Sequence, residues 1–393
     1  MRILYHHRTR GGDAQGIHIN ALCRSLEAVG HEVCLMGPAQ PAVTGKSDGA
    51  GTQPSEQKSP RALTIPGWLY ETAALLYNLP ALFALLIKGF RWRADAIYER
   101  YAVYNTAGLM AARILRIPLI LEVNAPLSEE MQRDGRLHWP RLATAMENSL
   151  IRRADAVIVV TRVLQGIFEK RGVTARQWLV MHNGIDRERF HRQVDGQHRR
   201  ETMQATADDV VAGFVGWIRP WHGVDQAIYA LQALRDEVPS LKLLLVGDGP
   251  ALPELRQLVA HLGLDDRVHF TGAVNREEIP SWLAAMDLGL QPDVTPYASP
   301  IKLFEYLAMG LPVIAPEREN IQEVMRHRQE GLLLPDGDVG ALARALLALS
   351  TDPALRSTLG RQAHDRIEQG GFLWQENARR VISFLNTYST RTG

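Results

Sequence analysis

The stretch 288–316, LGLQPDVTPYASPIKLFEYLAMGLPVIAP, predicts a strand, a loop, a helix and a second strand. Residues 288–290 form a short apolar run, which ends at Pro292. Ser299 and Pro300 predict a helix start, because serine can accept a hydrogen bond from a free helix amide and proline is tolerated at the first helical position. Gly310 predicts the helix end, and residues 312–315 are typical of a buried strand.

Lys302 and Glu305 lie three positions apart on this predicted helix, so they share one face. One interpretation is a solvated ion pair on an ordinary helix. The other is a receptor for a nucleoside diphosphate, since a helix N-terminus attracts anions through its free amides. In that case the phosphates lie near Ser299, Pro300, Ile301 and Lys302, and Glu305 accepts hydrogen bonds from the ribose hydroxyls.

The segment SPIKLFEYLAMGLPVIA resembles the donor-binding motif of glycosyltransferase family 4, whose members are retaining enzymes of the GT-B fold (glycosyl transferases group 1, exopolysaccharide type). The resemblance extends over nearly the whole chain. It implies an α/β protein with two Rossmann-like domains facing across a cleft. We expect residues 1–190 with the final helix, 372–393, to form the acceptor-binding domain. Residues 191–371 are expected to bind the nucleotide sugar.

Composition is that of an ordinary globular protein, with 46% hydrophobic and 22% charged residues, and 393 residues suffice for two domains. The net charge of +1 gives no reason to expect a nucleic-acid partner. Residues 1–190 nevertheless carry +7 and residues 191–393 carry −6. A basic first half suits anionic ligands or an anionic membrane surface, or it is scattered surface charge. Two cysteines and no signal peptide favour a reduced, cytoplasmic setting.

The first domain opens with a predicted strand at 2–5 and a glycine-bearing loop over 6–16. In the family this loop lies over the cleft, which makes Gly12 and Gly16 candidate donor-binding residues. The pattern is not a dinucleotide fingerprint. Residues 37–61, rich in Pro, Gly, Ser, Gln and Thr, predict a mobile loop.

Residues 67–90, GWLYETAALLYNLPALFALLIKGF, are the most apolar segment, and Glu71, Asn78 and Pro80 argue against a membrane-spanning helix. Two interpretations stay open. The segment forms two helices packed in the first domain, or it is a peripheral surface that meets the inner face of the membrane, where a lipid-linked acceptor lies.

The segment ILEVNAPLSEE resembles the family's loop near the point of sugar transfer, where many members have a histidine. Here Glu122 and Asn124 occupy that region, so the sequence leaves open which residue activates the acceptor. For both residues a catalytic role and a structural role are equally supported. HNGID, ending at Asp186 and followed by Phe190, resembles the family's hinge motif.

In the second domain, GWIRPWHG resembles the family loop whose two cations bind the diphosphate. Arg219 takes the first position, and His222 stands where lysine is usual, so the second charge is weaker or pH-dependent. The alternative is that Arg219 is an ordinary surface residue and that His222 is a buried structural residue. By the same resemblance the turn at Gly249 approaches the nucleotide, and the backbone near Val274 meets the base.

Tyr297 stands where the family's fuller motif has a glutamate, eight positions before Glu305, and we expect it near the donor sugar. The resulting hypothesis is a retaining transferase that needs no metal or other cofactor and uses a nucleotide-diphosphate sugar, with Arg219 and Lys302 stabilising the departing diphosphate. The acceptor is a glycan or a lipid-linked glycan, in bacterial exopolysaccharide or envelope synthesis. The alternatives are a non-catalytic sugar-nucleotide-binding subunit and a sugar-nucleotide epimerase of the same fold.

Overall fold

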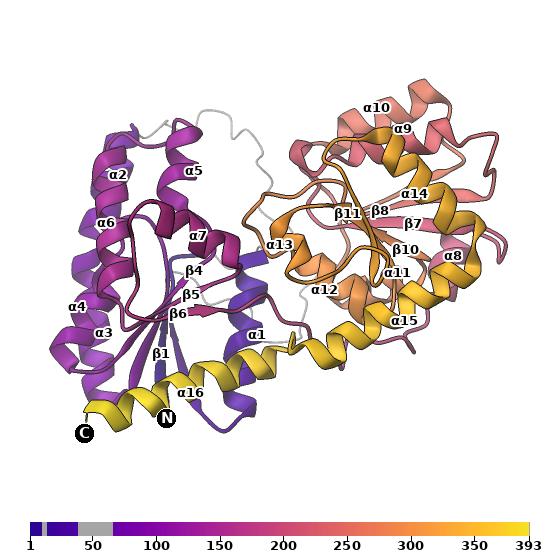
Figure 1. Cartoon of the computed structure of the whole chain (residues 1–393). Coiled ribbons are helices and arrows are strands. Elements are labelled where there is room, and N and C mark those ends of the chain that lie inside the picture. Colours follow the sequence, from indigo (N-terminus) through magenta and orange to yellow (C-terminus); the bar gives the residue numbers. More distant parts are fainter. Residues whose placement is uncertain (10–13, 38–65, 393) are drawn as a thin grey trace. The chain divides into compact units, whose positions relative to one another are not determined.

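The computed structural model describes residues 1–9, 14–37 and 66–392 and divides into two compact units (Figure 1). Unit 1 comprises residues 1–182 and 374–393, and unit 2 comprises residues 183–373. Gly12 and nearly all of the predicted mobile loop at 37–61 lie outside the described residues.

Unit 1 is built on a parallel sheet with the described strand order β2-β1-β3-β4-β5-β6. Its elements are β1 (Arg2–His6), α1 (Ala14–Ala28), β2 (Glu32–Met36), α2 (Gly67–Leu76), α3 (Asn78–Trp92), β3 (Ala96–Arg100), α4 (Ala107–Leu115), β4 (Leu119–Val123), α5 (Leu127–Arg133), α6 (Pro140–Arg153), β5 (Ala156–Val159), α7 (Arg162–Lys170), β6 (Trp178–Val180) and α16 (Trp374–Thr392). Strands β3 and β4 are buried along their whole length, as expected when helices cover both faces of a parallel sheet.

The last helix, α16, belongs to unit 1 and packs against α1. Trp374, Val381 and Leu385 are buried in the same core cluster as Ile19 and Leu22 of α1. The apolar face of α16 therefore has its partner in the first unit, although the chain has passed through the whole of unit 2 before reaching it.

Unit 2 repeats the architecture, with the described order β12-β11-β10-β7-β8-β9 and all pairs parallel. Its elements are α8 (Gln197–Thr202), β7 (Val210–Val215), the short 3₁₀ helix η1 (Pro220–His222), α9 (Val224–Ala233), β8 (Leu241–Val246), α10 (Leu252–Leu262), β9 (Val268–Gly272), η2 (Arg276–Glu278), α11 (Ile279–Ala284), β10 (Leu288–Leu290), α12 (Ile301–Ala308), β11 (Val313–Pro316), α13 (Glu319–Gln322), β12 (Gly331–Leu334), α14 (Val339–Thr351) and α15 (Pro353–Gly370).

The boundary between the units lies at 182/183, eight residues before the expected 190/191. Ile185 and Phe190 of the hinge-like motif are buried in the core of unit 2, which draws this segment into the second unit. The polar stretch 192–209 is likewise part of unit 2. Arg200 binds the backbone carbonyls of Ala285 and Asp209, so the charges in this stretch hold it to the unit.

Candidate active site

The topology of unit 2 creates a natural binding position at the carboxyl end of β7. Strand order runs outward from β7 to β8 and β9 on one side and to β10, β11 and β12 on the other. The connection after β7 leads toward one edge of the sheet and the connection after β10 leads toward the other edge. Ligands of open α/β sheets bind at the carboxyl ends of the strands where the connections diverge in this way, which is called the topological switch point. The two loops meet where the amide of Asp293 donates a hydrogen bond to the carbonyl of His222 at 3.1 Å.

Helix α12 is fixed against this edge by Tyr306. The amide of Val215 donates to the Tyr306 hydroxyl at 2.9 Å. A Cβ at Gly289 of β10 would lie 2.5 Å from the Tyr306 ring, so only glycine at that position lets the helix approach the sheet this closely. As a result the first turn of α12 reaches the loop after β7, and a Cβ at Gly216 would lie 3.2 Å from Nζ of Lys302.

Lys302, His222 and Arg219 are brought together from two separate segments. Burial lowers the pKa of Lys302 to about 7, and Glu305 opposes this shift. Burial also lowers the pKa of His222 to about 3, with further lowering by the charges of Lys302 and Arg219. His222 is therefore neutral in the free protein. The second cation of this loop is absent at neutral pH, which is a stronger effect than the weakened charge expected from the sequence.

The geometry of η1 leaves the Arg219 guanidinium available. Nδ1 of His222 accepts a hydrogen bond from the backbone amide of Arg219 at 3.2 Å, so the histidine shapes the loop. The exposed Arg219 side chain stacks on Trp221, with its guanidinium carbon 4.9 Å from the ring centroid. A guanidinium held on a ring face can still present donors to a phosphate.

Glu305 lies one turn after Lys302 and is buried. Its partner is Arg276 of η2, whose Nη2 lies 3.3 Å from Oε1 of Glu305. The backbone carbonyl of Arg276 in turn accepts a hydrogen bond from Arg189 at 3.0 Å. Arg276 was not predicted, because nothing in the local pattern of REE marks a contact with a residue 29 positions away. Glu305 is thus already paired with Arg276 before any ligand binds.

The start of α12 differs from the sequence prediction. Pro300 is the N-cap residue, the helix begins at Ile301, and no side chain caps it. Ser299 does not bind a helix amide, because its hydroxyl accepts from the backbone amide of Asn183 at 3.0 Å and its carbonyl accepts from the Asn183 side chain. The Leu303 amide donates to the Pro300 carbonyl at 3.1 Å, so the amides of Ile301 and Lys302 are the ones left for a ligand in the first turn. Tyr297 is buried in the preceding loop.

Gly249 supports the loop of Arg219 directly. Its φ is +153°, and a Cβ there would lie 2.2 Å from the carbonyl oxygen of Ile218. The amide of Ile218 donates to the Asp248 carbonyl at 2.7 Å, so the turns after β7 and β8 are bound to each other. Glycine at this position is explained by that packing. Val274, after β9, is half-buried against the core.

In unit 1 the carboxyl ends of β1, β3 and β4 carry a buried polar network around Glu122. The residue is fully buried, and Tyr98 donates to its carboxylate at 2.6 Å and Tyr5 at 3.2 Å. Arg100 and Asn124 donate to the other carboxylate oxygen. His18 of α1 lies 3.3 Å from that same oxygen.

This network makes Glu122 a poor proton acceptor. Although burial opposes ionisation, His18 and Arg100 together with the hydroxyl and amide donors hold the pKa of Glu122 at about 2. The carboxylate orients Asn124, whose side chain is half-buried. The geometry supports a positioning role for Glu122 toward Asn124. Arg100, His18 and Tyr98 were not predicted, because Tyr98 and Arg100 lie within β3 and His18 within α1, where no local pattern marks a contact with Glu122.

Gly16 lies buried in the first turn of α1, two residues before His18. His7, directly after β1, is fully buried with its Nε2 packed against Gly37. Burial lowers its pKa to about 4, so this imidazole is neutral at physiological pH.

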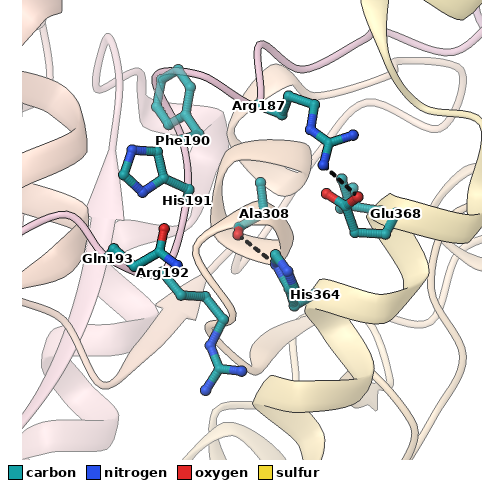
Figure 2. A pocket seen from close by; sticks show the side chains of 9 residues that line it. Arg187, Phe190, His191, Arg192, Gln193, Ala308, His364 and Glu368 are labelled. Atoms are coloured by element: carbon teal, nitrogen blue, oxygen red, sulfur yellow. Dashed lines mark hydrogen bonds and ion pairs between the residues drawn. The ribbon is translucent and has the colours of Figure 1, made fainter.

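A cavity of about 660 Å³ lies at the other end of α12, away from Lys302 (Figure 2). In Figure 2 the His364 side chain points to the carbonyl of Ala308, with 3.0 Å between Nδ1 and the oxygen, and Arg187 pairs with Glu368 at 3.1 Å. A histidine donating to the last carbonyls of a helix stabilises the helix end. The cavity contains none of the predicted site residues.

The chain matches two family models in succession. Residues 15–189 match Glycosyltransferase Family 4, and residues 209–352 match Glycosyl transferases group 1. The chain belongs to the family 4, group 1 glycosyltransferases and is an enzyme of that class. Its two parallel α/β units have the GT-B fold.

Relatives and solved structures agree with this assignment. The chain is 30% identical over 276 residues to the 2-deoxystreptamine glucosyltransferase of Streptomyces kanamyceticus, covering 67% of this chain and 70% of that protein. It is 27% identical to the D-inositol 3-phosphate glycosyltransferase of Streptomyces bingchenggensis, covering 93% and 84%. The fold matches Anabaena Alr3699/HepE in complex with UDP at a TM-score of 0.71 and 21% identity, over 98% and 100% of the two chains.

Proposed function

We propose that this glycosyltransferase moves a sugar from a nucleotide-diphosphate sugar to a glycan or lipid-linked acceptor with retention of anomeric configuration. The observation that carries the proposal is the meeting of Lys302, Arg219 and the first amides of α12 at the switch point of the unit 2 sheet. A half-buried lysine with its pKa lowered to about 7 is a site prepared for an anion.

The diphosphate fits this arrangement by charge. Lys302 comes from α12 and Arg219 from the loop after β7, and both carry positive charge. The amides at the start of α12 add partial positive charge. As the bond between sugar and phosphate breaks, negative charge grows on the departing diphosphate, where these groups stabilise it. The neutral His222 adds no charge to this arrangement. The uridine nucleotide is our first choice of donor, because the similar Anabaena protein was solved with UDP and with UDP-glucose.

Glu305 is proposed to bind the ribose. Its buried carboxylate lies one helical turn after Lys302, a spacing that suits a hydroxyl pair next to a diphosphate. Arg276 must then share this carboxylate or move to the nucleotide. Tyr297 and the backbone near Val274 and Gly249 are proposed to line the rest of the donor site.

Unit 1 is proposed to bind the acceptor at the edge around Asn124. Because Glu122 is held ionised with a pKa of about 2, it does not take the acceptor's proton. We propose that the departing phosphate takes that proton, so attack occurs on the face that the nucleotide leaves. Asn124, oriented by Glu122, holds the acceptor hydroxyl.

The remaining parts of the proposal concern conditions and place. Charge stabilisation by Lys302 and Arg219 is proposed to suffice without a metal ion or other cofactor. We place the enzyme in the cytoplasm, in contact with the inner membrane, acting in exopolysaccharide or envelope glycan synthesis.

The test is calorimetry with UDP, GDP, dTDP, CDP and ADP, with and without Mg²⁺, followed by transfer assays with the nucleotide sugar that binds. Binding of one nucleotide in the presence of a chelator supports the proposal. NMR of the product decides between retention and inversion. Sugar-nucleotide turnover without an acceptor would favour the epimerase, and binding without turnover over a broad acceptor set would favour the non-catalytic subunit.

A further inference from the structure

Helices α2 and α3 carry an apolar face that the described residues of the chain do not cover. Together they form the 26-residue stretch Gly67–Trp92, which is long and apolar enough to cross a membrane, yet only 28% of its most apolar window is buried. The chain breaks the helix at Tyr77, and the Asn78 side chain binds the backbone of Tyr104 and Thr106. The pair is thus fixed to unit 1 and lies along its surface.

The exposed positions of α3 follow a regular spacing. Leu79, Phe83, Ile87 and Phe90 are 56%, 62%, 60% and 79% exposed. Their spacing of four, four and three places them on one side of the helix. The opposite side, with Ala81, Leu82, Leu85 and Gly89, is buried against the unit.

Neighbouring helices expose further apolar side chains. Met110 and Ile114 of α4, the helix packed beside α3, are 45% and 60% exposed. Trp68, Leu69 and Tyr70 at the start of α2 are 48%, 44% and 57% exposed. Soluble monomers seldom expose so many large apolar side chains on neighbouring helices without a partner.

The charged residues of the same helices are mostly basic. Between residues 67 and 93 the acidic residue is Glu71, which is fully buried and binds the Trp139 amide at 3.1 Å. The basic residues Lys88, Arg91 and Arg93 gather at the far end of α3. An apolar helix face bordered only by positive charge complements an anionic bilayer. It fits a second copy of the chain less well, because this segment exposes no carboxylate to pair with the basic end.

The face begins at the edge of the candidate acceptor site. The Arg8 guanidinium carbon lies 4.7 Å from the centroid of the Tyr77 ring, between α2 and α3. The Tyr77 hydroxyl lies 3.5 Å from Nε2 of His6, at the carboxyl end of β1. A bilayer resting on α3 would therefore hold lipid-linked molecules near the strand ends that carry the Asn124 network.

We propose that Leu79, Phe83, Ile87 and Phe90 of α3, with the adjoining apolar residues of α2 and α4, form the surface by which this enzyme binds an anionic membrane. The surface inserts its aromatic and aliphatic side chains among the lipids while Lys88 and Arg91 contact the headgroups. Membrane binding by this surface does not depend on the proposed function. Only the link between the bilayer and a lipid-linked acceptor rests on it.

The test is flotation of the full-length protein with vesicles of phosphatidylcholine alone and of phosphatidylcholine mixed with phosphatidylglycerol. Wild type should float with the anionic vesicles and much less with the neutral ones. Phe83→Glu/Ile87→Glu should weaken binding at least about tenfold, since two inserted side chains become anionic. Lys88→Glu/Arg91→Glu should abolish the preference for phosphatidylglycerol. Tyr229→Glu, at a residue 46% exposed on α9 of unit 2, is the matched control and should float as wild type.

Calorimetry with UDP separates the two hypotheses. All variants should bind UDP as wild type does, because the substituted side chains lie in unit 1 or on α9, outside the donor site. Wild type that floats with neither vesicle, or a Phe83→Glu/Ile87→Glu variant that floats unchanged, would overturn the membrane surface whatever the donor result. A wild-type dimer in light scattering that this variant makes monomeric, without vesicle binding, would assign the face to contact between copies.

Discussion

The ammonium of Lys302 lies 3.6 Å from the centroid of the Phe214 ring, where α12 passes the end of β7. The same buried ring packs against His222, with centroids 5.4 Å apart. A ring face attracts a cation, yet burial still lowers the pKa of Lys302 to about 7. Lys302 and His222, both residues of the proposed diphosphate site, thus pack on the same ring. An anion bound beside Lys302 would stabilise its charged form.

Replacing Lys302 by methionine should lower kcat/KM by about two to three orders of magnitude, because a preorganised stabiliser of the departing diphosphate is worth about 3–4 kcal/mol. The thermal midpoint of the nucleotide-free variant should stay the same or rise, since a buried charge is removed while the aliphatic volume is kept. Transfer kinetics and a melting curve measure the two effects. Near-normal turnover would remove Lys302 from the mechanism.

Binding of UDP-glucose should weaken as the pH rises from about 7 to about 9. Free Lys302 has a pKa of about 7, and a bound diphosphate raises it. The complex therefore takes up protons above pH 7, which calorimetry in buffers of different ionisation enthalpy detects directly. Lys302→Arg, which stays charged throughout, should bind with little pH dependence. The same slope in both proteins would assign the titration to another group.

Glu305→Ala should weaken UDP binding about ten- to hundredfold, because two hydroxyls lose a charged acceptor and such hydrogen bonds contribute about 1.5–3 kcal/mol. The matched ligand is 2′,3′-dideoxy-UDP, which lacks both hydroxyls and should bind wild type and variant equally. If the variant weakens both ligands by the same factor, the effect comes from releasing Arg276 and the ribose contact is excluded.

Gly249→Ala should destabilise the protein and abolish nucleotide binding together. A Cβ at this position would lie 2.2 Å from the Ile218 carbonyl oxygen, in a backbone conformation that alanine disfavours. Relief requires movement of the Arg219 loop. Gly166→Ala in α7, where nothing lies within 4 Å of the added Cβ, is the control and should stabilise slightly. A stable Gly249→Ala enzyme with normal UDP affinity would show that the loop adapts.

Glu122→Gln should cost about 3–5 kcal/mol in the free energy of unfolding, since Arg100 then stays buried without its counter-charge. The folded pKa of Glu122 is about 2, below its ordinary value. Its contribution to stability is therefore complete above about pH 4.5 and is lost as the pH falls toward 2. Urea unfolding at neutral pH and at about pH 3 measures the free energy of unfolding of both proteins. The difference in this free energy between wild type and variant should be smaller at about pH 3. A constant gap would mean that the charge of Glu122 does not matter.

The sequence alone determined the alternation of strands and helices, the two-domain organisation and the position of the donor motif. These are local properties. A buried parallel strand needs a short apolar run, and an amphipathic helix needs its period. Lys302 and Glu305 lie three positions apart on one helix whatever surrounds them, so their relative placement could be predicted from spacing.

Tertiary structure decided which partner each polar group takes. Ser299 had the pattern of a helix cap, but Asn183, distant in the chain, binds it instead. Glu305 meets Arg276, and Glu122 meets Arg100, through packing that no local pattern encodes. The apolar segment 67–90 is two helices, as one interpretation held, yet its Phe83 side faces outward. A hydrophobic stripe specifies that a helix has an apolar side, and only the packing of distant segments determines whether the protein covers it.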